Sequence, residues 1–134
     1  MVNLIVKMNE QQSALVLKAL ELYTRIGTGQ LSELLWHPGM DAIHESKRSE
    51  AEEALYTLKK LAFSALKHSG DSLSIRNDDV AIESKNAYDI MQVMKHELAL
   101  ADNAKNSEHS VWRFEPRKAG DQPFIECKVT VPTK

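Results

Sequence analysis

The longest helical block near the end of the chain reads Ser84-Lys85-Asn86-Ala87-Tyr88-Asp89-Ile90-Met91-Gln92-Val93-Met94-Lys95-His96-Glu97-Leu98-Ala99-Leu100-Ala101. Apolar residues recur in it every three or four positions, which is the spacing of one face of an α-helix. The residues on that face are Ala87, Ile90, Met91, Met94, Leu98 and Ala101. We therefore predict a helix over 84–101 that buries this face against the rest of the chain.

Two earlier segments carry the same periodicity. The first follows Asn9, which together with Gln12 has the spacing of a capping box, and it ends at Gly27. The second starts at a capping box over 49–52 and is expected to end before Gly70, with one buried stripe formed by Ala51, Ala54, Leu55, Leu58, Leu61, Ala62, Ala65 and Leu66. A short helix through 34–36 is also expected. The sequence thus predicts a core of three to four helices.

The two ends of the chain alternate with a period of two, which is typical of half-buried strands. Residues 2–8 form the first such segment, and residues 111–115 and 124–131 form two more, joined by the loop 116–123. We therefore predict an α+β fold, with a mostly helical core and a small antiparallel sheet built from the N-terminal strand and a C-terminal β-hairpin.

Length and composition exclude several classes of protein. A chain of 134 residues is long enough to bury one core, so a single domain over 1–134 is expected. The single cysteine, Cys127, precludes an internal disulfide and falls among apolar strand positions. A net charge of -2 argues against a nucleic-acid partner. No apolar run exceeds four residues and no export signal is visible, so we expect a cytoplasmic protein without a membrane partner.

Catalytic and metal-binding patterns are missing from the sequence. The five histidines are not spaced as a His-Glu-x-x-His motif, and one cysteine cannot form a thiolate cluster. There is no Gly-x-Ser-x-Gly elbow to hold a nucleophile. We therefore expect no metal, no cofactor and no enzymatic activity.

Two places in the sequence are candidates for binding an anion. The first is the junction 27–30, where Arg25 precedes a glycine-rich helix end whose main-chain amides could face an anion; the alternative is a simple helix cap. The second is 112–118, where arginines and aromatic rings could pair with and stack on a nucleotide; the alternative is core aromatics with solvated arginines. The candidate ligand-binding residues are Tyr23, Arg25, Gln30, Trp112, Arg113 and Arg117.

Segments 19–30 and 86–99 resemble two blocks found in small uncharacterised proteins encoded by bacteriophages and prophages. The resemblance implies a phage accessory protein that acts in the host cytoplasm, and such proteins often bind a host protein or sequester a nucleotide signal used in host defence. It assigns no role to any residue. The polar members Arg25, Gln30, Gln92 and His96 lie off the clearest apolar stripes, so they are candidates for a surface site or for hydrogen bonds between helices.

Three functional hypotheses follow. The first is a non-enzymatic counter-defence protein that sequesters a small anionic ligand of the nucleotide type, with the site at a symmetric dimer interface. The alternative is a protein-interaction module that inhibits or adapts a host protein. A second alternative is a structural homo-oligomer, and all three hypotheses include association of copies of this chain.

Overall fold

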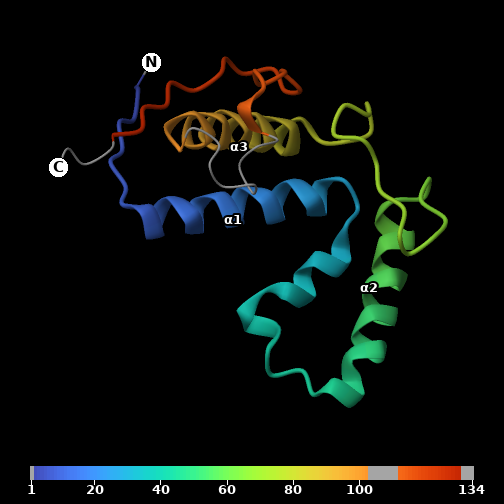
Figure 1. The fold of residues 1–134 in the computed structure, drawn as a ribbon. Helices are drawn as coiled ribbons and strands as arrows, with labels where there is room; N and C mark the ends of the chain where they lie inside the picture. Colours follow the sequence, from blue (N-terminus) through green and yellow to red (C-terminus); the bar gives the residue numbers. More distant parts are fainter. Residues whose placement is uncertain (1, 103–111, 131–134) are drawn as a thin grey trace.

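The computed structural model describes residues 2–102 and 112–130. Its elements, in order, are α1 (Glu10–Gly27), the 3-10 helices η1 (Leu31–Trp36), η2 (Pro38–Met40) and η3 (Glu45–Lys47), then α2 (Arg48–Ala62) and α3 (Ile82–Ala101). Figure 1 shows α1 and α3 packed side by side, with α2 standing apart beyond the short helices. The three long helices expected from periodicity are therefore present.

Helix α1 begins and ends where its sequence predicts. The Gln12 amide donates to Asn9 Oδ1 at 2.8 Å, and the Asn9 amide donates to Gln12 Oε1 at 3.0 Å, so the capping box is formed. At the other end, a Cβ on Gly27 would lie 2.0 Å from Ser84 Oγ at the start of α3. The two helices thus approach most closely where α1 lacks a side chain.

Helix α3 is the centre of the molecule, because it is buried on two faces. It packs against α1 and contributes Ala87, Met91, Val93, Met94 and Ala99 to the buried core, which also includes Leu31, Leu35, Leu66 and Val80. Its second buried face is polar. We call the extended segment that covers this face the C-terminal strap, residues 112–122, and it runs along α3 on the side away from α1 (Figure 1).

Side chains of α3 hold the main chain of the strap. The Gln92 side-chain amide donates to Arg117 O at 2.8 Å and accepts from the Arg117 N–H at 3.1 Å, which is the pairing that a neighbouring strand would supply. The Asp89 carboxylate accepts from the amides of Ala119 and Gly120 at 2.9 and 2.8 Å. These bonds hold the main chain of the strap at residues 117, 119 and 120.

The same polar stripe continues to both ends of α3. Near its start, Asn86 Oδ1 accepts from the Asp121 amide at 3.0 Å. Near its end, His96 Nδ1 lies 2.8 Å from Trp112 O, so the ring donates to that carbonyl. The side chains of residues 86, 89, 92 and 96 therefore form one row with a spacing of three to four residues.

The predicted antiparallel sheet is wrong. Neither residues 2–8 nor residues 112–130 form a strand in the described part of the chain, which is helical; Val111 and Val131, at the ends of the predicted hairpin, lie outside the described residues. The physical reason lies in α3, whose side chains bond the amides of residues 117, 119 and 120 and so hold the expected hairpin loop along the helix. A period of two indicates extended backbone, and extended backbone can be held by a helix as well as by a strand.

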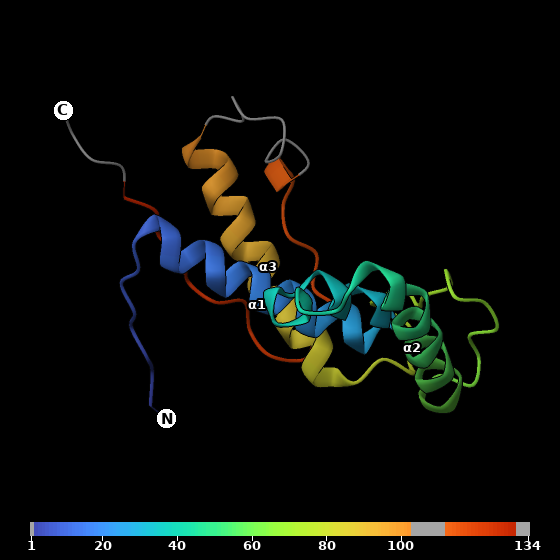
Figure 2. The ribbon, with the colours of Figure 1, turned by 90° about the horizontal axis from the view of Figure 1, so that it is seen from below.

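The prediction for α2 is only partly right. The helix ends at Ala62, well before Gly70, and it starts after Lys47, which makes no side-chain cap, so the expected capping box is not formed. One face of α2 meets η1, but Leu58 and Leu61 remain 51% and 80% exposed. Figure 2, seen from below, again shows α2 displaced from the α1–α3 pair. Much of the predicted buried stripe therefore lies on the surface.

Candidate functional site

A cavity of about 240 Å³ opens beside the α1–α3 pair, and we call it the α1–α3 cavity. It is lined by Glu21, Thr24, Arg25, Thr28, Gln30, Leu73, Ile75, Tyr88, Met91 and Trp112. Three of the six candidate residues from the sequence, Arg25, Gln30 and Trp112, therefore come together here from α1, the turn after it and the start of the strap.

The hydroxyl of Thr24 is the unusual group in this cavity. Thr24 is only 6% exposed, and its Oγ1 has no hydrogen-bond partner among the described residues. A buried polar atom left without a partner costs about 1–3 kcal/mol. Its neighbour Thr28 shows the ordinary arrangement, because Thr28 Oγ1 donates to Arg25 O and accepts from Gln30 Nε2, both at 3.0 Å.

The charge of Arg25 is balanced by two carboxylates. Its Nη2 lies 2.8 Å from Glu21 Oε1, and its Nη1 lies 2.8 Å from Glu33 Oε2. A second cation, Lys95, lies 4.0 Å from Glu21 Oε1, and its Nζ stands 4.7 Å from the centre of the Trp112 ring. An anionic group that enters here must therefore compete with Glu21 and Glu33 for the guanidinium.

The glycine-rich junction after α1 is a helix cap. The Thr28, Gly29 and Gln30 amides all donate to carbonyls in the last turn of α1, with the Gln30 amide 2.8 Å from Arg25 O. Gly29 adopts a φ of +89°, which favours glycine. Because these amides are already bonded, the alternative of an anion site on free main-chain amides is not supported at this junction.

The other three candidate residues do not line the cavity. Tyr23 is half exposed, and its hydroxyl donates to Glu83 Oε2 at 2.9 Å; this bond and the negative charge of Glu83 raise the pKa of Tyr23. Arg113 is exposed. Arg117 is held by its main chain, because its carbonyl accepts from Gln92 and from Arg76 Nη2. Arg113 and Arg117 therefore do not join Arg25 in lining this cavity.

Sequence reasoning missed Thr24, Thr28 and Tyr88. Thr24 and Thr28 are four residues apart on α1 and its cap, which places them on one face of the helix. A pair of hydroxyls at that spacing, immediately before the glycine-rich exit, was the available signal.

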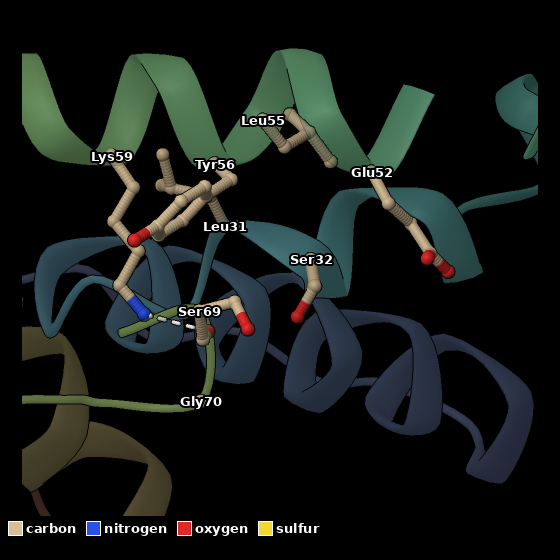
Figure 3. A pocket seen from close by; sticks show the side chains of 8 residues that line it. All are labelled: Leu31, Ser32, Glu52, Leu55, Tyr56, Lys59, Ser69 and Gly70. Carbon is tan, nitrogen blue, oxygen red and sulfur yellow. Dashed lines mark hydrogen bonds between the residues drawn. The ribbon is translucent and has the colours of Figure 1, made fainter. Parts of the chain in front are cut away.

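A second cavity, of about 200 Å³, lies between α2 and η1 and is lined by Leu31, Ser32, Glu52, Leu55, Tyr56, Lys59, Ser69 and Gly70 (Figure 3). Lys59 is only 3% exposed, yet its ammonium donates to Ser69 O at 2.9 Å and also to Asp71 O. A lysine in the last turn of a helix is also favoured by the helix dipole. Lys59 thus anchors the loop after α2, and we assign it this structural role.

No family model, no curated protein and no solved structure matches this chain. Among the described residues, no group of three or more histidine, cysteine, aspartate or glutamate side chains could hold a metal ion. Within residues 2–102 and 112–130, no helix is long and apolar enough to cross a membrane.

Proposed function

We propose that this chain is a non-enzymatic binding protein that holds a small ligand in the α1–α3 cavity. The observation that carries the proposal is Thr24, which lines the cavity and whose hydroxyl oxygen is buried without a hydrogen-bond partner among the described residues. A ligand atom within hydrogen-bonding reach of Oγ1 would satisfy a group that otherwise costs about 1–3 kcal/mol. Buried polar groups of this kind are rare in folded proteins and call for an explanation.

The lining suggests a ligand with a flat polar ring and an anionic group, as in a nucleotide. Trp112 offers an aromatic surface, and the Gln30 amide and the Thr24 hydroxyl offer hydrogen bonds at ring edges. Arg25 offers a cation for the anionic group. Because the cavity is smaller than the roughly 300–1,000 Å³ of typical ligand pockets, a base-sized ring would enter while phosphate stays at the mouth.

The wider role that we propose is that of a bacteriophage counter-defence protein that sequesters a nucleotide signal of the host. This role rests on the resemblance of segments 19–30 and 86–99 to blocks in small phage proteins. Those two segments supply most of the cavity lining, from Glu21 to Gln30 and then Tyr88 and Met91. The parts of the sequence that carry the resemblance therefore meet at one site.

A thermal-shift screen tests the proposed ligand class. The panel contains AMP, GMP, cyclic AMP and cyclic GMP, with adenosine and inorganic phosphate as the separate halves of a nucleotide. A nucleotide present at 100 times its Kd should stabilise the chain by about 2.7 kcal/mol. At the same concentration, adenosine or phosphate alone should stabilise it less. No shift with any member of the panel would refute the nucleotide proposal.

A matched pair of arginine variants locates the effect. Arg25 and Arg48 are similarly exposed, and each forms an ion pair with a glutamate four residues away on the same helix, but only Arg25 lines the cavity. Arg25→Gln should abolish or strongly reduce the nucleotide-dependent shift, whereas Arg48→Gln should leave it unchanged. Equal losses in the two variants would show that the shift does not come from this site.

The alternative of a host-protein interaction module is favoured by the N-terminal segment 2–8. This segment is extended, and the side chains of Val2, Leu4 and Ile5 are almost fully exposed. Exposed apolar side chains on one segment are typical of a surface that meets another protein. If this alternative holds, the full chain should capture a host protein and a chain without residues 2–8 should lose that capture.

A further inference from the structure

The outer face of α2 carries an apolar row that the chain itself does not cover. Its members are Ala51, Ala54, Leu58 and Leu61, spaced three, four and three residues apart, and we call this row the α2 seam. Leu58 and Leu61 are 51% and 80% exposed. Among the helices of the described part of the chain, α2 packs against η1 and η3, and its Tyr56 and Lys59 also bond the loop after it.

The spacing of the α2 seam is that of a helix-pairing surface. Apolar residues that alternate between three and four positions form the a and d positions of two-helix coiled coils. A helix of 15 residues is about 22 Å long, so the seam runs along most of one side of α2. An exposed row of this kind faces a second helix more favourably than it faces water.

The chain exposes more surface than a compact monomer of its mass. Its accessible surface is 10268 Å² over the whole chain. A compact monomer of 15.1 kDa is expected to expose about 7,100 Å², so roughly 3,000 Å² is in excess. The extended segment 2–8 contributes to this excess as well as the α2 seam. A stable interface buries about 800 Å² on each partner, which is a fraction of the excess.

We infer that the α2 seam is the interface between two copies of this chain, with their α2 helices antiparallel. A seam that is complementary to itself fits the two-fold symmetry of most homodimers. The orientation follows from charge, because the exposed glutamates of α2, Glu50, Glu52 and Glu53, lie in its first half and the exposed Lys60 lies in its second half. Antiparallel pairing places unlike halves opposite each other and also opposes the two helix dipoles. This inference is independent of the α1–α3 cavity.

Light scattering during size-exclusion chromatography tests the inference on the full chain. The wild type should have a mass about twice the 15.1 kDa of one chain. Leu58→Lys/Leu61→Lys should shift the mass to that of one chain while the helical circular dichroism stays the same, because both side chains already face solvent. Leu15→Lys is the matched control, because Leu15 is a leucine of α1 that is 68% exposed, and this variant should remain dimeric.

Three results would overturn the inference: a monomeric wild type, a Leu58→Lys/Leu61→Lys variant that stays dimeric, or equal dissociation of the Leu15→Lys control. A mixing experiment tests the orientation and also serves if the double variant fails to fold. Ala51→Glu and Leu61→Lys should each weaken the dimer alone, and an equimolar mixture should restore it, because residue 51 of one copy faces residue 61 of the other only in an antiparallel pair. A mixture that stays monomeric would contradict the antiparallel arrangement.

Discussion

Replacement of Asp89 by alanine should detach the C-terminal strap from α3. Asp89 is 4% exposed, and its carboxylate accepts three hydrogen bonds, from the Ala119 and Gly120 amides and from Gln92 Nε2. Hydrogen bonds to a charged group contribute about 1.5–3 kcal/mol each, but the buried charge also costs desolvation, so the bonds do not add fully. We expect the free energy of unfolding to fall by about 2–4 kcal/mol, which corresponds to roughly 10 °C in Tm for a chain of this size.

Two measurements check this prediction. Urea denaturation gives the change in the free energy of unfolding, and Asp78→Ala is the control, because Asp78 lies exposed in a turn and should change stability by less than about 0.5 kcal/mol. Hydrogen exchange then shows where the change occurs: the Ala119 and Gly120 amides should be protected in the wild type and lose that protection in Asp89→Ala. Unprotected wild-type amides, or equal stabilities of the two variants, would refute the role given to Asp89.

Gly27→Ala should destabilise the chain by about 1–3 kcal/mol in thermal denaturation, because its Cβ would lie 2.0 Å from Ser84 Oγ; a second change, Ser84→Gly, should recover much of the loss. A hydrogen bond from the Asn86 side chain lowers the pKa of Asp121 in the folded chain below its ordinary 3.8. The stability that Asp121 contributes is therefore complete above pH 3.8. It is lost as the pH falls through the lowered pKa of the folded chain. An NMR titration should therefore show the pKa of Asp121 rising in Asn86→Ala, and an unchanged value would contradict the assignment. Burial raises the pKa of the Cys127 thiol, so iodoacetamide should alkylate Cys127 more slowly at pH 8 in the folded chain than in urea.

The helices could be predicted from the sequence because their signals are local. Asn9 and Gln12 set the start of α1 through bonds between neighbouring residues, and Gly27 marks its end. Of the apolar face predicted for α3, Ala87, Met91 and Met94 are buried, whereas Ala101 is exposed. The start of α2 was less predictable. The helix begins at Arg48, before the expected capping box, and its N-cap residue Lys47 makes no side-chain hydrogen bond.

Residues 112–115 and 124–130 could not be distinguished from strands by their own pattern. Extended backbone shows a period of two whether a strand or a helix holds it. The distinguishing signal lay instead on α3, where Asn86, Asp89, Gln92 and His96 form a polar row that faces inward. A polar row on a helix usually faces water, so its partner becomes evident only when the strap is placed against it.

The candidate site was half predictable for a similar reason. Arg25, Gln30 and Trp112 are charged, amide-bearing or aromatic and stand out in a sequence. Thr24 does not, because a threonine within a helix gives no sign of being buried without a hydrogen-bond partner. That property arises only from the packing of α1 against the rest of the chain.

The proposal of a ligand in the α1–α3 cavity is tested most directly by titrating the fluorescence of Trp112 in a Trp36→Phe chain, in which Trp112 is the remaining tryptophan. Titration with the nucleotide that gives the largest thermal shift, or with AMP if the shifts are equal, should change the emission and reach saturation. Thr24→Val in the same chain should weaken that binding and raise the stability of the unliganded protein, because valine removes the buried hydroxyl. Emission that does not respond, or a Thr24→Val chain that binds as tightly as its parent, would contradict the proposal.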